Sequence, residues 1–202
     1  MPPLWLCQTI RVITMKEKLI QQIADYIPVN EQEETDKLTL LNLLQCDADI
    51  SVRESLLAHL TASAWVVNRD RTKVLMAYHK LYDSWAWLGG HADGSWDLSS
   101  VAEKEAREES GIQDLHFVSK NPVSLEILTV DGHEKKGKYV PCHLHLNVTY
   151  LFEAEENQNL ACKPDENSGV AWIPMDSLAE KCSEPWFVER IYSKLVKKAK
   201  EM

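Results

Sequence analysis

Three glutamates, Glu105, Glu108 and Glu109, stand at spacings that place them on one face of a helix. At about 100° of rotation per residue, they fall within a sector of roughly 100°. Like charges three and four residues apart repel one another, so the pattern favours a positive charge close by. A hard divalent cation such as Mg²⁺ would supply it through carboxylate ligands. A solvated acidic face, held by Lys104 four residues before Glu108, is the alternative.

The helix that carries these glutamates has recognisable ends in the sequence. Asp97, Ser99 and Ser100 are all suited to cap its N-terminus. Gly111 follows the last periodic residue and supplies the left-handed conformation that commonly stops a helix. Residues 87–90 read Trp-Leu-Gly-Gly, which predicts a short strand that runs into a glycine-rich turn open to a ligand. The predicted unit is therefore a strand, a loop and an acidic helix.

The stretch from Gly90 to Ile112 resembles the signature of the Nudix hydrolases. That signature is Gly, five residues, Glu, seven residues, Arg-Glu, an apolar residue, any residue, Glu-Glu, any residue, Gly and an apolar residue. The three glutamates take the helix positions, and the spacing matches throughout. Two positions depart, because Trp96 stands where Glu is expected and Lys104 where Arg is expected. Lysine lacks the planar fork of arginine, so this second change is not neutral.

The loss of the loop glutamate leaves the number of metal ions open. Asp93 and Asp97 lie near Trp96, and either carboxylate could stand in for the missing one.

The resemblance implies an α/β fold, an α/β/α sandwich with a mixed sheet, and hydrolysis of a nucleoside diphosphate linked to a second moiety, X. It implies Mg²⁺ or Mn²⁺ as the cofactor, bound by Glu105, Glu108 and Glu109 with the Gly90 carbonyl. The catalytic residues would be Glu105, Glu108 and Lys104. Two rival functions stay open: a nucleotide-binding regulator that has lost turnover, and a prenyl-diphosphate isomerase of the same fold.

Other residues are candidates for a general base or for contacts with the substrate. Glu105 and Glu166, which lies on a late loop, are the two candidates for the base, and a plain turn residue is the alternative for Glu166. His91 and Asp93 lie in the glycine loop. In addition, His143 and His145 are two residues apart on a predicted strand and share one face. Such a pair without a third ligand nearby is weak support for zinc, and half-buried strand residues are the alternative.

The elements that must hold these residues follow from the rest of the 202-residue chain. We predict a tail at 1–15, a helical lead-in at 16–58 and the hydrolase domain at 59–202, with Met15 as an alternative start. The lead-in would cover a face of the sheet, close over the site or form a homodimer contact. The periodicity predicts helices near 16–27, 35–45, 51–57, 175–181 and 184–200, and strands near 60–67, 73–79, 115–118, 123–130, 139–154 and 170–173.

Charge and composition limit the kinds of partner that we expect for this protein. A net charge of -9 argues against nucleic acid as a partner but admits a small nucleotide-type substrate whose phosphates are met by metal ions. Five scattered cysteines without metal-type spacing indicate a reduced, cytoplasmic protein. No run of 18 apolar residues is present, so no membrane span is predicted.

Overall fold

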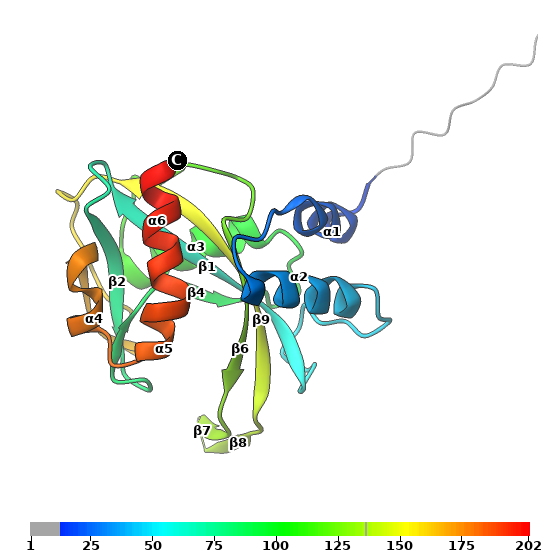
Figure 1. Ribbon diagram of the computed structural model, residues 1–202. Coiled ribbons are helices and arrows are strands. Elements are labelled where there is room, and N and C mark those ends of the chain that lie inside the picture. The colour runs from blue at the N-terminus through cyan, green and yellow to red at the C-terminus, as the bar shows by residue number, and fades with distance from the viewer. Residues whose placement is uncertain (1–12, 136) are drawn as a thin grey trace, which may run out of the picture.

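The computed structural model describes residues 13–135 and 137–202, and it shows a mixed sheet flanked by helices (Figure 1). The strands are β1 (Ala58–Asn68), β2 (Lys73–His79), β3 (Ser84–Ala86), β4 (Leu88–His91), β5 (His116–Phe117), β6 (Ser124–Val130), β7 (His133–Lys135), β8 (Lys138–Val140), β9 (His143–Ala154) and β10 (Asn167–Pro174). The helices are α1 (Met15–Asp25), α2 (Glu31–Leu44), α3 (Leu98–Ser110), α4 (Leu178–Lys181), α5 (Pro185–Phe187) and α6 (Ser193–Glu201), with a 3₁₀ turn at Met175–Ser177 and a π-helical turn at Val188–Tyr192.

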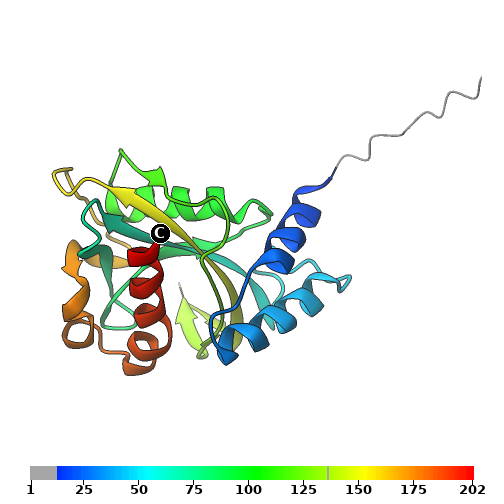
Figure 2. The ribbon, with the colours of Figure 1, turned by 45° about the horizontal axis from the view of Figure 1, so that its top comes forward.

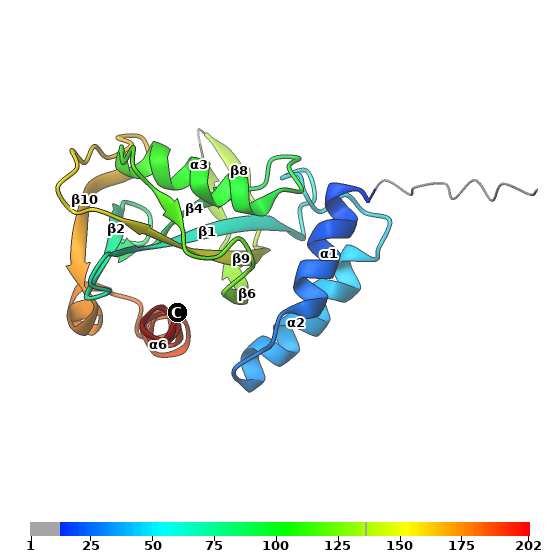
Figure 3. The same cartoon turned by 90° about the horizontal axis from the view of Figure 1, so that it is seen from above.

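The main sheet runs in the order β10-β2-β1-β9-β5, with β3 beside β2, β4 beside β1 and β6 beside β9. Strands β1 and β9 are parallel over the whole length of β1, from Ala58 opposite Leu144 to Asn68 opposite Ala154. The other strand pairs in the described residues are antiparallel. Figure 3 shows α3 on one side of β1 and β9 and α6 on the other. The predicted α/β/α sandwich with a mixed sheet is confirmed.

Strand β1 is buried on both faces, and its alternating side chains enter two separate cores. Leu60, Ala62 and Ala64 pack in the cluster that contains the apolar side chains of α3. Trp65 and Val67 point the other way and pack with the apolar side chains of α6. A strand covered on both faces reads as a nearly continuous apolar run, which is what this segment shows.

Most of the predicted elements are confirmed, some with different bounds. The strands predicted at 60–67 and 73–79 are β1 and β2, which pair as an antiparallel hairpin, and the acidic helix is α3. The strand predicted at 139–154 is divided into β8 and β9, and the helix predicted at 184–200 into α5, a π-helical turn and α6. Of the predicted tail, residues 1–12 lie outside the described residues, whereas Thr14 caps α1 with a capping box.

The helix predicted at 51–57 is wrong, because this segment consists of turns and bends. The Ile50 carbonyl accepts a hydrogen bond from the Leu60 N–H at 2.7 Å, and the Ser51 carbonyl accepts one from the Gly94 N–H at 2.9 Å. Carbonyls bound in this way are not available to close helical turns. The segment instead ties the start of β1 to the glycine loop.

Helices α1 and α2 pack side by side at one end of the sheet (Figures 1 and 2). Their buried apolar side chains join the core on the α3 side of the sheet. Helix α2 also meets the outer edge of β6: Asp36 accepts a hydrogen bond from the Ile127 N–H at 3.1 Å, and Gln32 donates to the Leu125 carbonyl at 3.5 Å. The lead-in therefore covers a strand edge of the sheet as well as extending its core.

Four charged side chains form a buried cluster between α2, β6 and α6, which we call the charge cluster: Glu33, Glu126, Lys194 and Lys198. The Lys194 Nζ lies 3.0 Å from Glu33 Oε1 and 3.1 Å from Glu126 Oε1, and Lys198 Nζ lies 3.1 Å from Glu33 Oε1. Both carboxylates are fully buried. Each charge is tolerated in the interior because it has a partner of opposite sign. Removal of one partner would leave the other charge buried and unpaired.

The structure also shows the state of the described cysteines and how long and how apolar the described helices are. The described cysteines, Cys46, Cys142, Cys162 and Cys182, are all free thiols. None of the described helices combines the length and the apolar character needed to cross a bilayer.

We expect Lys194→Met to lower the free energy of unfolding by about 3 kcal/mol, because Glu126 would lose its cation in a buried setting while Glu33 keeps Lys198. The control is Lys197→Met on the same helix, whose exposed ammonium lies 4.0 Å from Glu201, and it should change stability by less than about 0.5 kcal/mol. Urea denaturation measures both. Equal effects of the two substitutions would contradict the assigned role of the charge cluster.

The charge cluster should also make the fold sensitive to acid. Burial by itself raises the pKa of Glu33, but Lys194 and Lys198 outweigh burial and bring it down from 4.5 to about 2. A carboxyl with a lowered pKa stabilises the fold above its unfolded pKa, and this contribution is lost as the pH falls toward the folded value. The unfolding free energy should therefore decline between about pH 4.5 and about pH 2. Glu33→Gln should show a shallower decline in urea titrations at stepped pH, and an unchanged slope would refute the assignment.

Candidate active site

The glycine loop is held against β1 at very short range. Strand β4 pairs with β1 so that Gly89 is opposite Ser63 and Gly90 is opposite Ala62. A Cβ atom on Gly89 would lie 2.5 Å from the Ala62 carbonyl oxygen, and one on Gly90 would lie 2.6 Å from Cδ of Glu105. Both positions therefore require glycine, the first for backbone packing and the second to leave room for the helix carboxylate.

Helix α3 starts and ends as its sequence predicts. The Asp97 side chain caps the N-terminus by accepting a hydrogen bond from the Ser100 N–H at 3.2 Å. Gly111 ends the helix with φ of 73°, a left-handed conformation that favours glycine. These two ends fix which turn of α3 faces β4.

The predicted metal ligands on α3 differ in exposure. Glu109 is buried, and its Oε2 accepts a hydrogen bond from the Gly89 N–H at 2.9 Å. Glu105 is 12% exposed and lies against Gly90, whereas Glu108 is 46% exposed. Lys104 Nζ lies 3.5 Å from Glu105 and 3.6 Å from Glu108, so it can neutralise part of their charge. Glu105 and Glu109 line the cavity described below, and Glu108 is the most exposed of the three.

Glu109 has an unusual electrostatic setting. Burial raises its pKa to about 7, and the nearby carboxylates Glu105 and Glu166 add to the rise, against hydrogen bonds from Gly89 and Asn167. Asn167 donates to Glu109 Oε1 at 3.1 Å, while its own Oδ1 is buried without a hydrogen-bond partner. A carboxylate with a strongly shifted pKa in a cavity marks a candidate functional position.

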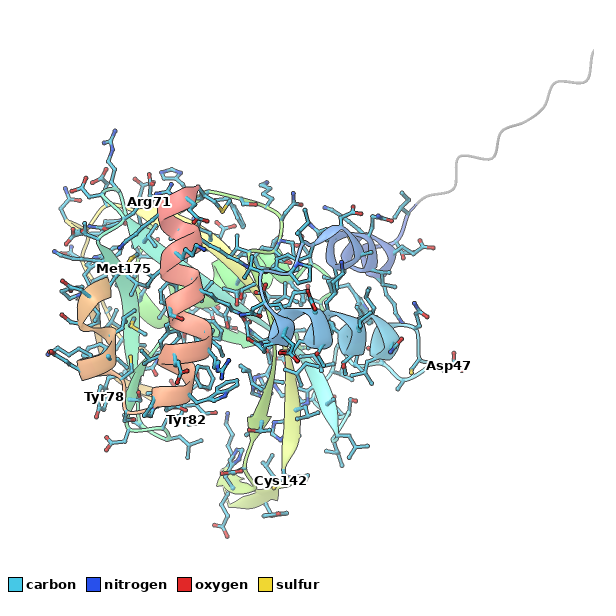
Figure 4. The ribbon with its side chains drawn as sticks, in the orientation of Figure 1. Asp47, Arg71, Tyr78, Tyr82, Cys142 and Met175 are labelled. Atoms are coloured by element: carbon cyan, nitrogen blue, oxygen red, sulfur yellow. The ribbon has the colours of Figure 1, made fainter. Side chains whose placement is uncertain are left out.

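The cavity has a volume of about 610 Å³, which is in the usual range for small-molecule sites. Sequence-predicted residues in its lining are Gly90, His91, Glu105, Glu109, His143, His145 and Glu166, and four basic side chains also line it: Arg53, Lys80, Lys135 and Lys163. Tyr82, another lining residue, and Cys142 in the turn before β9 are labelled at the same lower end of the molecule in Figure 4. This end is where the β7–β8 ribbon projects (Figure 1).

The floor of the cavity is a polar network that sequence reasoning missed. Thr61 and Ser63 on β1 both donate to Asn147 Oδ1, at 3.0 and 2.9 Å. The Asn147 amide in turn donates to Glu126 Oε2 at 2.9 Å. The only sequence signal for Asn147 was its position two residues after His145, on the same face of β9.

Trp96, which departs from the Nudix signature, and the two aspartates near it all have structural partners. Trp96 packs against the apolar core, with Lys16 Nζ 5.0 Å from its ring centroid. Asp97 accepts hydrogen bonds from Ser99 and Ser100 as the helix cap. Asp93 is held by Arg53 through two hydrogen bonds of 2.6 and 2.7 Å. Both aspartates are thus already occupied by neighbouring donors.

Glu166 and the strand histidines also lie in the cavity. Glu166 pairs with Lys163 at 3.1 Å, and although burial raises its pKa, Lys163 outweighs that effect and lowers it. It is therefore ionised at neutral pH. His91, His143 and His145 converge with a fourth histidine, His59 of β1, that had no assigned role in the sequence.

Comparison with known proteins finds a matching family and solved structures with a similar fold. The model of the NUDIX domain family matches residues 57–195 of the chain. No curated protein matches it. A solved C. elegans Ap4A hydrolase binary complex is 14% identical with a TM-score of 0.50, over 71% of this chain and 98% of the other. An E. coli dihydroneopterin triphosphate pyrophosphohydrolase is 14% identical with a TM-score of 0.50, over 68% of this chain and 94% of the other. At such identities the structural likeness concerns the fold.

The close approach of β4 to β1 predicts a large effect of Gly89→Ala. Because the added methyl group would meet backbone atoms that cannot move aside, we expect a loss of about 3 kcal/mol or more in unfolding free energy. Gly169→Ala is the matched control, since its Cβ would lie 3.6 Å from the Trp85 ring, in ordinary contact. Thermal or urea denaturation would measure both, and a Gly89→Ala protein as stable as the control would show that the strands can separate there.

Proposed function

Because the chain belongs to the Nudix family of pyrophosphohydrolases, we propose that it hydrolyses a diphosphate bond in a nucleoside diphosphate linked to a second moiety, X, with Mg²⁺ or Mn²⁺ as the cofactor. The observation that carries the proposal is the pair of sheltered carboxylates, Glu105 and Glu109, facing a cavity that basic side chains also line. Anionic phosphates need positive partners, and the chain as a whole has a net charge of -9. Arg53, Lys135 and Lys163 bring positive charge to the lining of the cavity beside these carboxylates.

The residues at the acidic helix fit a hard divalent cation. Glu105 and Glu109 offer carboxylate oxygens, and the buried Oδ1 of Asn167 beside Glu109 has no hydrogen-bond partner. Oxygen donors of this kind suit Mg²⁺ and Mn²⁺. In our proposal, Glu105, Glu108 and Glu109 hold the ion together with the Gly90 carbonyl. When bound, such an ion supplies positive charge to the diphosphate oxygens and lowers the pKa of a coordinated water.

The other cavity residues bind and position the substrate in this proposal. Arg53, Lys135 and Lys163 would contact phosphate oxygens, since all three line the cavity. Lys104 would hold Glu105 and Glu108 in place through its two ion pairs. Glu166, ionised and in the cavity, is available to accept a proton from the attacking water, while its pairing with Lys163 would let it act as an anchor instead.

The test is turnover of the pure protein with Mg²⁺ or Mn²⁺ on nucleoside triphosphates, nucleotide sugars, ADP-ribose and dinucleoside polyphosphates. Glu105→Gln, Glu108→Gln and Glu109→Gln should each lower kcat by about 10²-fold or more, because loss of a ligand removes several kcal/mol of charge stabilisation. Glu103→Gln on the same helix, which pairs with Arg107 at 2.8 Å, should leave turnover unchanged.

Three outcomes would contradict the proposal. Full activity in Glu108→Gln would mean that the site assignment is wrong. Tight binding of a nucleotide without any product would instead favour a regulator that keeps the fold. Turnover of a prenyl diphosphate with retention of the diphosphate group would favour the isomerase.

A further inference from the structure

Four histidines from three adjacent strands meet on one face of the sheet, and we call them the histidine cluster: His59 on β1, His91 on β4, and His143 and His145 on β9. His59 lies directly opposite His145 in the parallel pair, and His91 lies opposite Thr61, two residues further along β1. One nitrogen from each ring lies within 4.8 Å of the corresponding nitrogen of every other ring. The cluster thus supplies the third and fourth ligands that the sequence did not place near the pair on β9.

Backbone carbonyls determine which ring nitrogens face one another. His59 Nδ1 is 3.1 Å from the Ser55 carbonyl, and His143 Nδ1 is 2.8 Å from the Pro141 carbonyl. A carbonyl can only accept, so the proton lies on Nδ1 in both rings and Nε2 carries the electron pair. In the metal-free chain, that electron pair of His143 can accept a hydrogen bond from His145 Nε2. His59 Nε2 is buried and has no hydrogen-bond partner. Carbonyl contacts to the far ring nitrogen, as here, orient histidine ligands toward a metal ion.

The distance between His143 Nε2 and His145 Nε2 is 3.2 Å. Two nitrogen ligands about 2.0–2.1 Å from a tetrahedral Zn²⁺ ion lie about 3.3 Å apart, so this pair already has the required spacing. The ring centroid of His59 lies 4.7 Å from that of His143 and 5.2 Å from that of His145. Small side-chain movements would therefore bring the remaining nitrogens together.

Charge argues against a phosphate site made from the same rings. His59 and His143 are buried, and His59 Nε2 has no hydrogen-bond partner, so this setting favours neutral rings. Neutral imidazoles attract anions only weakly, but they are good metal ligands. The charged groups that face the cluster are Arg53 and Asp93, which pair with each other, and Lys135.

We propose that the histidine cluster binds one divalent transition-metal ion of the Zn²⁺ class, at a site separate from the acidic helix. Imidazole nitrogens favour such ions, whereas the carboxylate oxygens of α3 favour Mg²⁺ or Mn²⁺. Four protein ligands leave no open coordination position, which is typical of a structural site. The ion would fasten β1, β4 and β9 together and would fix His91, whose neighbour Gly90 begins the glycine loop. This inference does not depend on the proposed hydrolysis.

The first experiment uses the full chain without a histidine tag, treated with a chelator and then titrated with Zn²⁺ in a calorimeter. We expect one Zn²⁺ per chain, bound in the presence of excess Mg²⁺, and a rise in Tm on binding because the ion stabilises only the folded state. Co²⁺ in place of Zn²⁺ should give the intense visible absorption of a tetrahedral nitrogen-ligated ion. No uptake, or a weak octahedral Co²⁺ spectrum, would overturn the proposal.

The second experiment compares His59→Asn and His143→Asn with His116→Asn. Asparagine keeps a donor near the Nδ1 position but removes the Nε2 ligand, whereas His116 is an exposed residue on β5 that pairs with Asp114. Each cluster variant should bind Zn²⁺ at least about 100-fold more weakly, and the control should bind it as the parent does. Circular dichroism of the metal-free proteins checks folding, and should a variant fail to fold, the Co²⁺ spectrum of the parent decides.

Two further arms separate this site from the acidic helix. Glu105→Gln should retain Zn²⁺ binding, even where it loses turnover. Zinc lost in Glu105→Gln but kept in both histidine variants would overturn the proposal. So would tight binding of inorganic phosphate to the metal-free chain that disappears in the histidine variants, because it would identify the cluster as an anion site.

Discussion

The parallel pairing of β1 with β9 is the constraint on which both the core and the cavity depend. Side chains alternate along a strand, so the register decides which residues enter the apolar core and which face the cavity. In the observed register, Leu60 and Ala62 are on the core side, and Thr61 and Ser63 meet Asn147 on the other. A slip of one residue would turn Leu60 and Ala62 toward the cavity and take Thr61 and Ser63 away from Asn147. The two strands lie far apart in the sequence, so this pairing has to be maintained by contacts from the rest of the fold.

The polar floor of the cavity is connected to the helical lead-in through a continuous set of contacts. Asn147 donates to Glu126, Glu126 lies 3.1 Å from Lys194, and Lys194 lies 3.0 Å from Glu33 on α2. Buried networks of this kind are stabilising only when each member has its partners. The lead-in, which lies before the strands in the chain, therefore takes part in holding the cavity floor in place.

The parts of the structure that the sequence predicts well are those set by local rules. The caps of α3, the stop at Gly111 and the turn between β1 and β2 depend on residues within a few positions of one another. The helix predicted at 51–57 failed because the Leu60 and Gly94 N–H groups bind the Ile50 and Ser51 carbonyls, and the local sequence contains no information about such distant partners. His59 was missed as a partner of His143 and His145 for the same reason, since only the strand register brings them together.

The contact of α2 with β6 has a consequence for the chain in solution. An uncovered sheet margin offers a row of free amide and carbonyl groups on which a strand from another molecule can add. Here Asp36 accepts from the Ile127 N–H and Gln32 donates to the Leu125 carbonyl, so α2 blocks the addition of a strand along that margin. A molecule without α2 would leave this margin uncovered, and fibrous or amorphous self-association would compete with native folding.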